Sequence, residues 1–351
     1  DEFVVLCEEL HGRADAIAIA DRVNAAVSGP FVIDDVEVFV GMSIGIAFPD
    51  RLGDDLDPAT LIRDADAAMY RAKDLGRNRL ELFDTEMREA AVIRLQIEND
   101  LRRAVERDEL TLHYQPIIDL RSGRVIGAEA LVRWQHPVRG LLPPDDFIGV
   151  AEETGTIEAL GRHVLELAVS EMAGIVERVG VKGLRLGVNL SARQLSAPGL
   201  DHVVDEACRR HGWPHRDLLL EITETALAAG AAGPQDVLAR IRDLGVDLAI
   251  DDFGTGHSSL AQLRDIPFVE LKVDKGFVHG ACERATLSAI FRASVGLAHQ
   301  LRMSAVGEGV ESLSDWEFAR AAGCDLLQGY FVARPMPAEG LEAWERAWRS
   351  R

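Results

Sequence analysis

The chain has 351 residues, 47% of them hydrophobic, and a formal net charge of −20 at pH 7. This length accommodates one large domain or two of medium size, with enough apolar side chains for a sizeable core. The acidic balance argues against a nucleic-acid polymer or an anionic membrane surface as a partner, because both repel a negatively charged protein. An anionic ligand must therefore be held locally, by metal ions or by a few placed basic side chains.

The cysteines form neither a CxxC pair nor a zinc-ligand spacing, so we expect reduced thiols at Cys7, Cys208, Cys282 and Cys324. No apolar run approaches the ~20 residues of a membrane span, and no signal peptide opens the chain. These features predict a cytoplasmic location. The abrupt start in a strand-like run suggests missing upstream residues, which leaves a membrane anchor in the full-length protein open.

Residues 1–84 alternate strand-like and helical stretches. The expected elements are a strand over Phe3–Cys7, a helix over Asp15–Val27, a strand pair over Phe31–Val40 and Met42–Ala47, a helix over Pro58–Asp74 and a strand over Leu80–Phe83. Residues 85–108 are rich in Glu, Arg, Ala and Leu and contain neither Pro nor Gly, which predicts a helical linker. This linker either only spaces two domains or also transmits a signal between them.

From Leu110 onward, short apolar runs each precede a polar residue and a helix-length segment. The polar residues are Glu129, Asn189, Glu221, Asp251, Lys272, Glu308 and Gln328. Most intervals are about 20 to 36 residues, as in consecutive βα units, and the longer step from 129 to 189 suggests one unit without a polar terminus. About 250 residues, the usual size of a (β/α)₈ barrel, remain for this part.

In such barrels the C-terminal ends of the strands meet at one mouth, so these seven side chains are expected to converge there. The alternative is that each polar residue only caps the helix that follows it. Lys, Gln and Glu are poor N-caps, and seven coincidences disfavour that alternative.

Three or more carboxylates and a carboxamide brought together would repel one another unless cations neutralise them. Oxygen ligands without His or Cys favour two Mg²⁺ or Mn²⁺ ions over zinc. The adjacent Asp251 and Asp252 would let one carboxylate bridge two ions about 3.5 to 4 Å apart, as in metal-assisted phosphoryl displacement. Lys272 would add positive charge at the reacting phosphorus. Gly254 and Gly256 permit tight turns in the loop that follows the aspartates.

Several short motifs follow one another along this part of the chain: Tyr114-Gln115-Pro116-Ile117, Glu129-Ala130-Leu131-Val132-Arg133-Trp134, Asn189-Leu190-Ser191, Glu221-Ile222-Thr223-Glu224, Asp251-Asp252-Phe253-Gly254-Thr255-Gly256, Leu271-Lys272-Val273-Asp274, Glu308-Gly309-Val310-Glu311 and Gln328-Gly329-Tyr330. In sequence and order they resemble the motifs of the EAL family of cyclic di-GMP phosphodiesterases, and the resemblance covers residues 97–345. It implies a modified TIM barrel with one antiparallel strand over residues 97–351, and a homodimer formed through this barrel.

The resemblance also implies the site. Glu129, Asn189, Glu221 and Asp251 would hold one metal ion, and Asp251 with Asp252 a second.

Lys272 and Glu308 would act on the attacking water, as the catalytic residues. Arg133 and Gln115 would contact the substrate, while Gln328 would support the water network and the substrate.

Glu224 and Glu311 would stabilise loops, with Glu224 fastening the loop after Asp252. The chain departs from the family pattern in three minor ways: His257 stands in place of tyrosine, Gly307 in place of alanine and Ser312 in place of threonine. No expected metal ligand is missing.

Residues 1–84 contain a second set of motifs: Asp1-Glu2-Phe3, Ser43-Ile44-Gly45-Ile46-Ala47, the run 65–73 and Gly76-Arg77-Asn78. These motifs resemble the C-terminal half of the α+β GGDEF domain of diguanylate cyclases. Lys73 and Arg77, with Asp1 and Glu2, are candidate nucleotide contacts, and a complete domain would bind GTP. This half alone cannot synthesise a cyclic dinucleotide.

The resemblance thus predicts hydrolysis of cyclic di-GMP to linear pGpG in bacterial second-messenger signalling. Two alternatives stay open at this point. One is a receptor that binds cyclic di-GMP without turnover, and the other is a bifunctional GGDEF-EAL protein whose net activity depends on the upstream region.

Overall fold

The computed structural model describes residues 2–8, 10–33, 36–49, 57–180, 183–229, 234–255 and 266–349. The chain divides into two compact units, Asp1–Ile97 and Glu98–Arg351. Helix α3 (Thr85–Ala104), which covers most of the predicted linker, contributes residues to both. Within the described part of the chain, no helix is both long and apolar enough to span a membrane.

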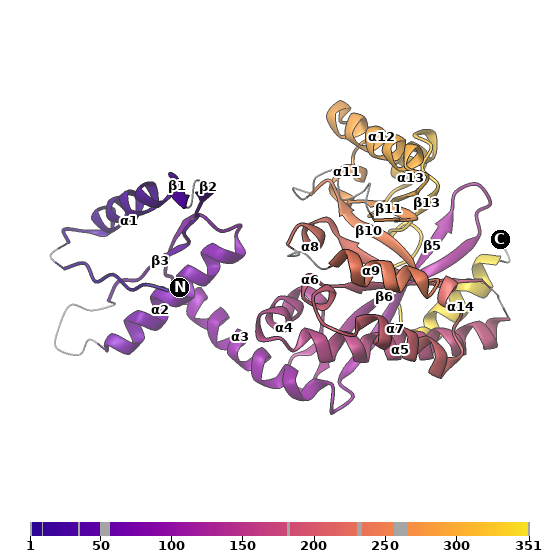
Figure 1. Ribbon diagram of the computed structural model, residues 1–351, viewed down its shortest axis with the longest axis horizontal. Helices are drawn as coiled ribbons and strands as arrows, with labels where there is room; N and C mark the ends of the chain where they lie inside the picture. Colours follow the sequence, from indigo (N-terminus) through magenta and orange to yellow (C-terminus); the bar gives the residue numbers. More distant parts are fainter. Residues whose placement is uncertain are drawn as a thin grey trace. The chain divides into compact units, whose positions relative to one another are not determined.

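The first unit contains two helices and two small sheets besides its share of α3 (Figure 1). Its elements are α1 (Arg13–Val27), β1 (Pro30–Ile33), β2 (Val36–Phe39), β3 (Ile44–Ile46), α2 (Pro58–Asp74) and β4 (Leu80–Leu82). Helix α2 has the predicted bounds: Asp57 caps it by accepting from the N–H groups of Ala59 and Thr60, and Pro58 occupies its first position.

Two expectations for this unit were wrong. Residues 3–7 form no strand, and Phe3 is 88% exposed. The two predicted strands between residues 31 and 47 do not pair with each other. Instead, β1 pairs with β2 in a hairpin within the first stretch, and β3 pairs in parallel with β4. Gly45 lets α2 pack closely on β3, because a side chain there would overlap the backbone of Ala65 and Met69 on that helix.

The second unit is a closed barrel of eight strands, in the order β5, β13, β12, β11, β10, β9, β8, β6 and back to β5. The strands are β5 (Leu110–Asp119), β6 (Val125–His136), β8 (Arg185–Leu190), β9 (Leu218–Thr223), β10 (Asp247–Phe253), β11 (Glu270–Val273), β12 (Ser304–Gly307) and β13 (Leu326–Leu327). Strand β5 is antiparallel to both of its neighbours, and the other barrel strands are parallel. The expected modified TIM barrel is therefore confirmed.

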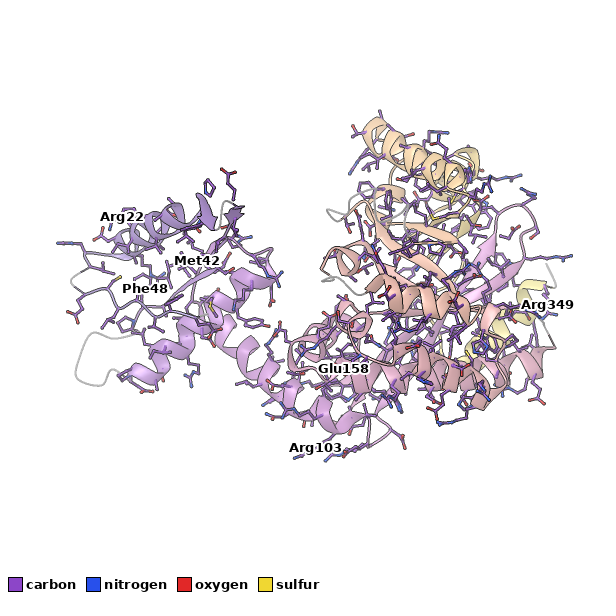
Figure 2. The ribbon with its side chains drawn as sticks, in the orientation of Figure 1. Arg22, Met42, Phe48, Arg103, Glu158 and Arg349 are labelled. Atoms are coloured by element: carbon purple, nitrogen blue, oxygen red, sulfur yellow. The ribbon has the colours of Figure 1, made fainter. Side chains whose placement is uncertain are left out.

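Helices surround the barrel (Figure 1). They are α4 (Ile148–Thr154), α5 (Ile157–Val179), α6 (Ala192–Leu195), α7 (Leu200–His211), α8 (Glu224–Ala229), α9 (Pro234–Asp243), α11 (Lys275–Val278), α12 (Ala285–Gln300), α13 (Leu313–Ala321) and α14 (Ala338–Arg349), with the 3₁₀ turns η1 (Pro144–Asp146) and η2 (His215–Asp217). Figure 2 shows Glu158 on α5 and Arg349 on α14 at the outside of this unit.

The described residues between Glu129 and Asn189 form no eighth barrel strand, contrary to the expectation of a unit without a polar terminus. The short strand β7 (Gly140–Leu142) in this stretch pairs with β6 alone. The eighth barrel strand is β5, which precedes the series of strands and helices that begins with β6. It pairs with both β6 and β13, and so it closes the ring.

An ion pair between a partly exposed arginine and a buried glutamate lies at the start of two barrel strands. Arg185 is the first residue of β8 and donates to Glu270, the first residue of β11, whose side chain has no exposed surface. Glu270 Oε1 has no hydrogen-bond partner among the described residues, so this carboxylate depends on the guanidinium. The pair links the N-terminal ends of two strands that are not neighbours in the sheet.

We predict that Arg185→Met lowers the free energy of unfolding by about 3–5 kcal/mol, because it leaves the Glu270 charge buried and unpaired. Urea unfolding followed by circular dichroism measures the change. The double variant Arg185→Met/Glu270→Leu is the matched control, and most of the lost stability should return in it. Parent-like stability of the single variant would contradict the assigned dependence of Glu270 on Arg185.

Candidate metal centre

The barrel brings all seven strand-associated polar residues to one mouth, together with Gln115 of β5. Asn189 and Lys272 are each the last but one residue of their strands, while Glu308 and Gln328 directly follow β12 and β13. Glu221 and Asp251 each lie two residues before the ends of their strands. The sequence pattern therefore predicted this convergence.

Glu129 is the exception to the strand-end pattern, because it lies within β6 rather than at its end. The strand continues to His136, since β5 and β7 still pair with it there. Its parallel ladder with β8, however, stops at Ala130. Glu129 thus lies at the end of the parallel part of the barrel, level with the other residues.

Lys272 is the centre of the cluster. Its side chain has no exposed surface, and its Nζ lies 2.7 Å from Glu221 Oε2 and 2.7 Å from Glu308 Oε1. The same Nζ is 3.3 Å from Glu129 Oε2 and 3.3 Å from Asp251 Oδ1. One ammonium group therefore faces four carboxylates from four different strands or their ends.

Amide side chains complete the buried network around Glu129. Asn189 Nδ2 donates to Glu129 Oε1 at 2.6 Å, and Gln328 Nε2 donates to Glu129 Oε2 at 2.6 Å. Gln328 Nε2 also lies 3.0 Å from Gln115 Oε1, and Gln115 Nε2 donates to the carbonyl of Ala333 at 3.1 Å. Gln115 and Gln328 are buried and hold Glu129 in place from the barrel interior. Asn189, in contrast, is exposed at the mouth.

Most of the acidic groups resist ionisation. Burial and the neighbouring Glu129 raise the pKa of Glu221 well above its ordinary value, and burial and Asp251 do the same for Glu308. Burial also raises the pKa of Asp251. Burial, together with Asp251 and Asp274, raises the pKa of Asp252 to about 6. Each raised pKa means that the ionised carboxylate is destabilised at its position, and a nearby positive charge would remove this destabilisation.

Glu129 and Lys272 behave in the opposite way. Burial opposes the ionisation of Glu129, but Lys272 and the two amide donors outweigh it and hold the pKa of Glu129 below its ordinary value. Burial likewise opposes the charge on Lys272, yet the surrounding carboxylates, with Asp251 first, raise its pKa well above the ordinary value. Glu129 and Lys272 thus form a charged pair at the centre of the cluster, and the other acidic side chains surround this pair.

The donor set fits divalent cations. Carboxylate oxygens of Glu129, Glu221 and Asp251 lie within 4.8 Å of one another, and so do those of Asp251, Asp252 and Glu308. Glu221 Oε1 is buried and accepts no hydrogen bond from any described residue, so it is free to bind an ion. Asp251 is shared by both groups, which suits a ligand that bridges two ions.

The backbone turns sharply after Asp251. Asp252 has φ +53°, an uncommon value for a residue other than glycine, and its N–H donates to Asp251 Oδ1 at 2.9 Å. Two residues later, the Gly254 N–H donates to Glu224 Oε2 at 3.0 Å, which is the kind of contact that the loop-fastening prediction requires. Gly256 and His257, both singled out from the sequence, lie outside the described residues.

Two further predicted residues make their recorded contacts outside the acidic cluster. Arg133 of β6 is half-buried, and its Nη1 donates to the carbonyl of Val132 at 2.8 Å. Glu311 is exposed, and its backbone N–H donates to Asp315 Oδ2 at 3.2 Å. Ser312, one of the three departures from the family pattern, caps α13 by accepting from Asp315 N–H.

The candidate nucleotide contacts of the first unit are only partly together. Lys73 Nζ is 3.7 Å from Glu2 Oε1, and the ammonium lies over the Tyr70 ring. Arg77 is exposed with φ +58°, in the turn after α2. Asp1 lies outside the described residues. Their proposed role with GTP stays a prediction.

Gly187 is a site residue that the sequence reasoning did not single out. A methyl group added there would overlap Glu221 Oε1 and would lie 3.5 Å from the Glu129 Cα atom. The absence of a side chain at Gly187 is thus what makes room for the Glu221 carboxylate. A lone glycine inside a strand was the available signal, since it often marks a close approach.

The fold and the site together define a class: a closed barrel with an acidic cluster at its mouth, built to hold divalent cations. The EAL domain family matches residues 98–335, and the chain belongs to this family. A second family, diguanylate cyclase, GGDEF domain, matches residues 1–79.

Three relatives have names that describe an activity. The chain is 42% identical over 344 residues to the bifunctional diguanylate cyclase/cyclic di-GMP phosphodiesterase MucR of Pseudomonas aeruginosa, covering 98% of this chain and 50% of MucR. It is 37% identical to the cyclic di-GMP phosphodiesterase PdeR of Escherichia coli, covering 100% of this chain and 52% of PdeR. The cyclic di-GMP phosphodiesterase NbdA of P. aeruginosa is 38% identical, and the match covers 99% of this chain and 44% of NbdA. The chain thus spans about half the length of these relatives.

Solved structures agree with this assignment. The PaMucR phosphodiesterase in complex with c-di-GMP has a TM-score of 0.67 and 41% identity, covering 70% of this chain and 99% of that one. The EAL domain of Mycobacterium smegmatis DcpA has a TM-score of 0.59 and 31% identity, covering 68% and 98%. The shared region is the barrel that carries the acidic cluster.

We predict that Gly187→Ala weakens divalent-cation binding by roughly 10- to 100-fold, the loss typical of changes that misplace a metal ligand. Its methyl group forces Glu221 from its position. Calorimetric titration of the protein with Mn²⁺ measures the affinity. Gly296→Ala is the matched control, because a methyl group on Gly296 meets nothing within 4 Å. If the Gly187→Ala variant and the parent bound Mn²⁺ with equal affinity, the space beside Gly187 would not be required for Glu221 to bind the ion.

Proposed function

We propose that this chain hydrolyses cyclic di-GMP to linear pGpG with the help of two divalent cations. The observation that carries the proposal is the complete set of oxygen ligands around Lys272, gathered on a barrel of the EAL family. The names of MucR, NbdA and PdeR as cyclic di-GMP phosphodiesterases support the substrate. The net charge of −20 makes local cations necessary for binding an anionic dinucleotide.

The cations would be held by Glu129, Asn189, Glu221 and Asp251 for one ion and by Asp251 and Asp252 for the other. When bound, they would supply an activated water and a Lewis acid for in-line displacement at phosphorus. Because the ligands are carboxylates and an amide, without His or Cys, we propose Mg²⁺ or Mn²⁺.

The chain's own catalytic groups lie beside these ligands. The Glu308 carboxylate lies 2.7 Å from the Lys272 ammonium and within 4.8 Å of the Asp251 and Asp252 oxygens, so it is suited to take a proton from a water held there. The Lys272 ammonium is fixed by four carboxylates and stabilises the negative charge that grows on the phosphoryl oxygens. Water adds to phosphorus, the bond from phosphorus to the ribose O3′ breaks, and the leaving oxygen gains a proton, so one water is consumed per bond opened.

Arg133 lies on β6 four residues beyond Glu129, and its guanidinium is suited to a substrate phosphate oxygen. Gln115 and Gln328 are buried below Glu129 and bond to each other. We therefore assign them chiefly to orienting Glu129. Glu224 would hold the loop that follows Asp252, and Glu311 would act on the loop after Glu308.

Several further expectations are part of the same proposal. We propose a homodimer formed through the EAL barrel, GTP binding by a complete GGDEF domain, and a cytoplasmic site of action. Bifunctional activity of the whole protein is favoured by the name of MucR, whose relatedness extends over 98% of this chain.

We predict that Glu129→Gln lowers the rate of cyclic di-GMP hydrolysis by roughly 100-fold or more, beyond the usual cost of changing a residue that only orients a ligand. The variant keeps the shape of the side chain but removes a metal-binding charge. Chromatography of pGpG formed in the presence of Mg²⁺ or Mn²⁺ measures the rate. Glu158→Gln, an exposed change on α5, should keep the parent rate.

Chelation of divalent cations by EDTA should abolish hydrolysis by the parent protein, and added Mg²⁺ or Mn²⁺ should restore it. The same samples titrated with cyclic di-GMP in Ca²⁺ separate the enzyme from a receptor. Tight binding with no pGpG from the parent protein, under conditions where a positive-control phosphodiesterase is active, would replace the proposed activity by that of a receptor.

A further inference from the structure

The short helix α11 directly follows the strand that carries Lys272. Asp274 caps it, because its carboxylate accepts from the Gly276 N–H at 2.9 Å and its carbonyl accepts from the Phe277 N–H at 2.9 Å. At its other end, the Gly280 N–H lies 3.4 Å from the buried carboxylate of Asp315 on α13. Helix α11 is therefore fixed to the barrel at both ends.

Phe277 of α11 lies against the loop that follows the paired aspartates. Gly254 has φ +103°, and a methyl group added there would lie 2.7 Å from the Phe277 Cε2 atom and 3.2 Å from its Cζ. The Phe277 ring thus lies directly against the Gly254 backbone. No side chain other than that of glycine fits between them, for reasons of both space and backbone conformation.

A second contact fixes Gly254. Its N–H donates to the carboxylate of Glu224, the first residue of α8, which directly follows β9. The same turn is closed by the Asp252 carbonyl, which accepts from the Thr255 N–H at 3.2 Å and from its hydroxyl at 2.9 Å. Gly254 is therefore gripped from two sides, two residues after Asp252. A left-handed aspartate persists only where the surrounding structure over-determines its conformation.

The first residue of α11 touches the other metal-side loop. A methyl group added at Gly309, which has φ +61°, would overlap the Lys275 side chain. Gly309 directly follows Glu308. One turn of helix thus packs against the loop of Asp252 through Phe277 and against the loop of Glu308 through Lys275.

We propose that Phe277 is a positioning residue that holds the Gly254 turn in place and thereby keeps Asp252 aimed at the second cation. This inference rests on the proposed function for the identity of Asp252 as a metal ligand. Phe277 itself touches neither cation nor substrate. It acts through the backbone of Gly254, as Glu224 does from the other side.

Calorimetric titration of the metal-free protein with Mn²⁺ tests the proposal without relying on activity. In Phe277→Ala the weaker binding step should lose roughly 10- to 100-fold in affinity, the loss typical of residues that orient metal ligands. The tighter step, which depends on Glu129 and Glu221, should stay unchanged. In the hydrolysis assay, the Mn²⁺ concentration for half-maximal rate should rise by a similar factor, and saturating Mn²⁺ should return the rate toward that of the parent.

Two variants separate positioning from packing alone. Phe277→Leu keeps a bulky apolar group against Gly254 and should recover most of the affinity for the second ion. Phe318→Ala removes a buried phenylalanine from α13, where it packs against Phe291, and should lower thermal stability without changing either Mn²⁺ step.

The outcomes distinguish this inference from the function on which it rests. If the parent hydrolyses cyclic di-GMP and Phe277→Ala binds the second Mn²⁺ like the parent, the positioning role is wrong and the proposed function stands. If the parent binds two Mn²⁺ ions without hydrolysis and Phe277→Ala still loses the weaker step, the positioning role stands and the function is wrong. Equal weakening by Phe318→Ala would reduce Phe277 to ordinary packing and overturn the proposal.

Discussion

The buried ammonium of Lys272 is the constraint on which the mouth of the barrel depends. Four carboxylates lie within 3.3 Å of it, so at most one of four negative charges is balanced within the chain. Burying such an excess is costly unless the acids hold protons or gain cations. The raised pKa values of Glu221 and Glu308 express this cost. A barrel built around this lysine is therefore pre-organised for divalent cations, whose binding relieves the repulsion.

Much of the barrel could be predicted from the sequence, because buried parallel strands read as short apolar runs and their ends carry the polar residues. That pattern located Asn189, Lys272 and Gln328 at one mouth. It could not show that β6 extends beyond Glu129, because this extension depends on pairing with β5 and β7, which lie elsewhere in the sequence. The family resemblance alone predicted one antiparallel strand, and the structure shows that this strand is β5.

Local patterns were less informative where long-range contacts decide the structure. Helix α2 was predicted with its exact bounds because Asp57 and Pro58 form a local start signal. The run over residues 3–7 has strand-like composition, yet it pairs with no described strand, and composition alone cannot supply a partner. Likewise, the room that Gly187 leaves for Glu221 and the grip of Phe277 on Gly254 join residues distant in sequence, and only the three-dimensional structure shows them.

Closure of the ring by β5 also decides how the second unit can meet other chains. A strand paired on both sides offers no free backbone groups to a neighbouring molecule. Among the described strands of this unit, β7 has a partner on one side alone, whereas each strand of the ring has a partner on both sides along at least part of its length. Strand addition by another chain is therefore disfavoured, and side chains would form most of any interface on this unit. Such an interface can form and separate without disturbing the backbone that holds the acidic cluster.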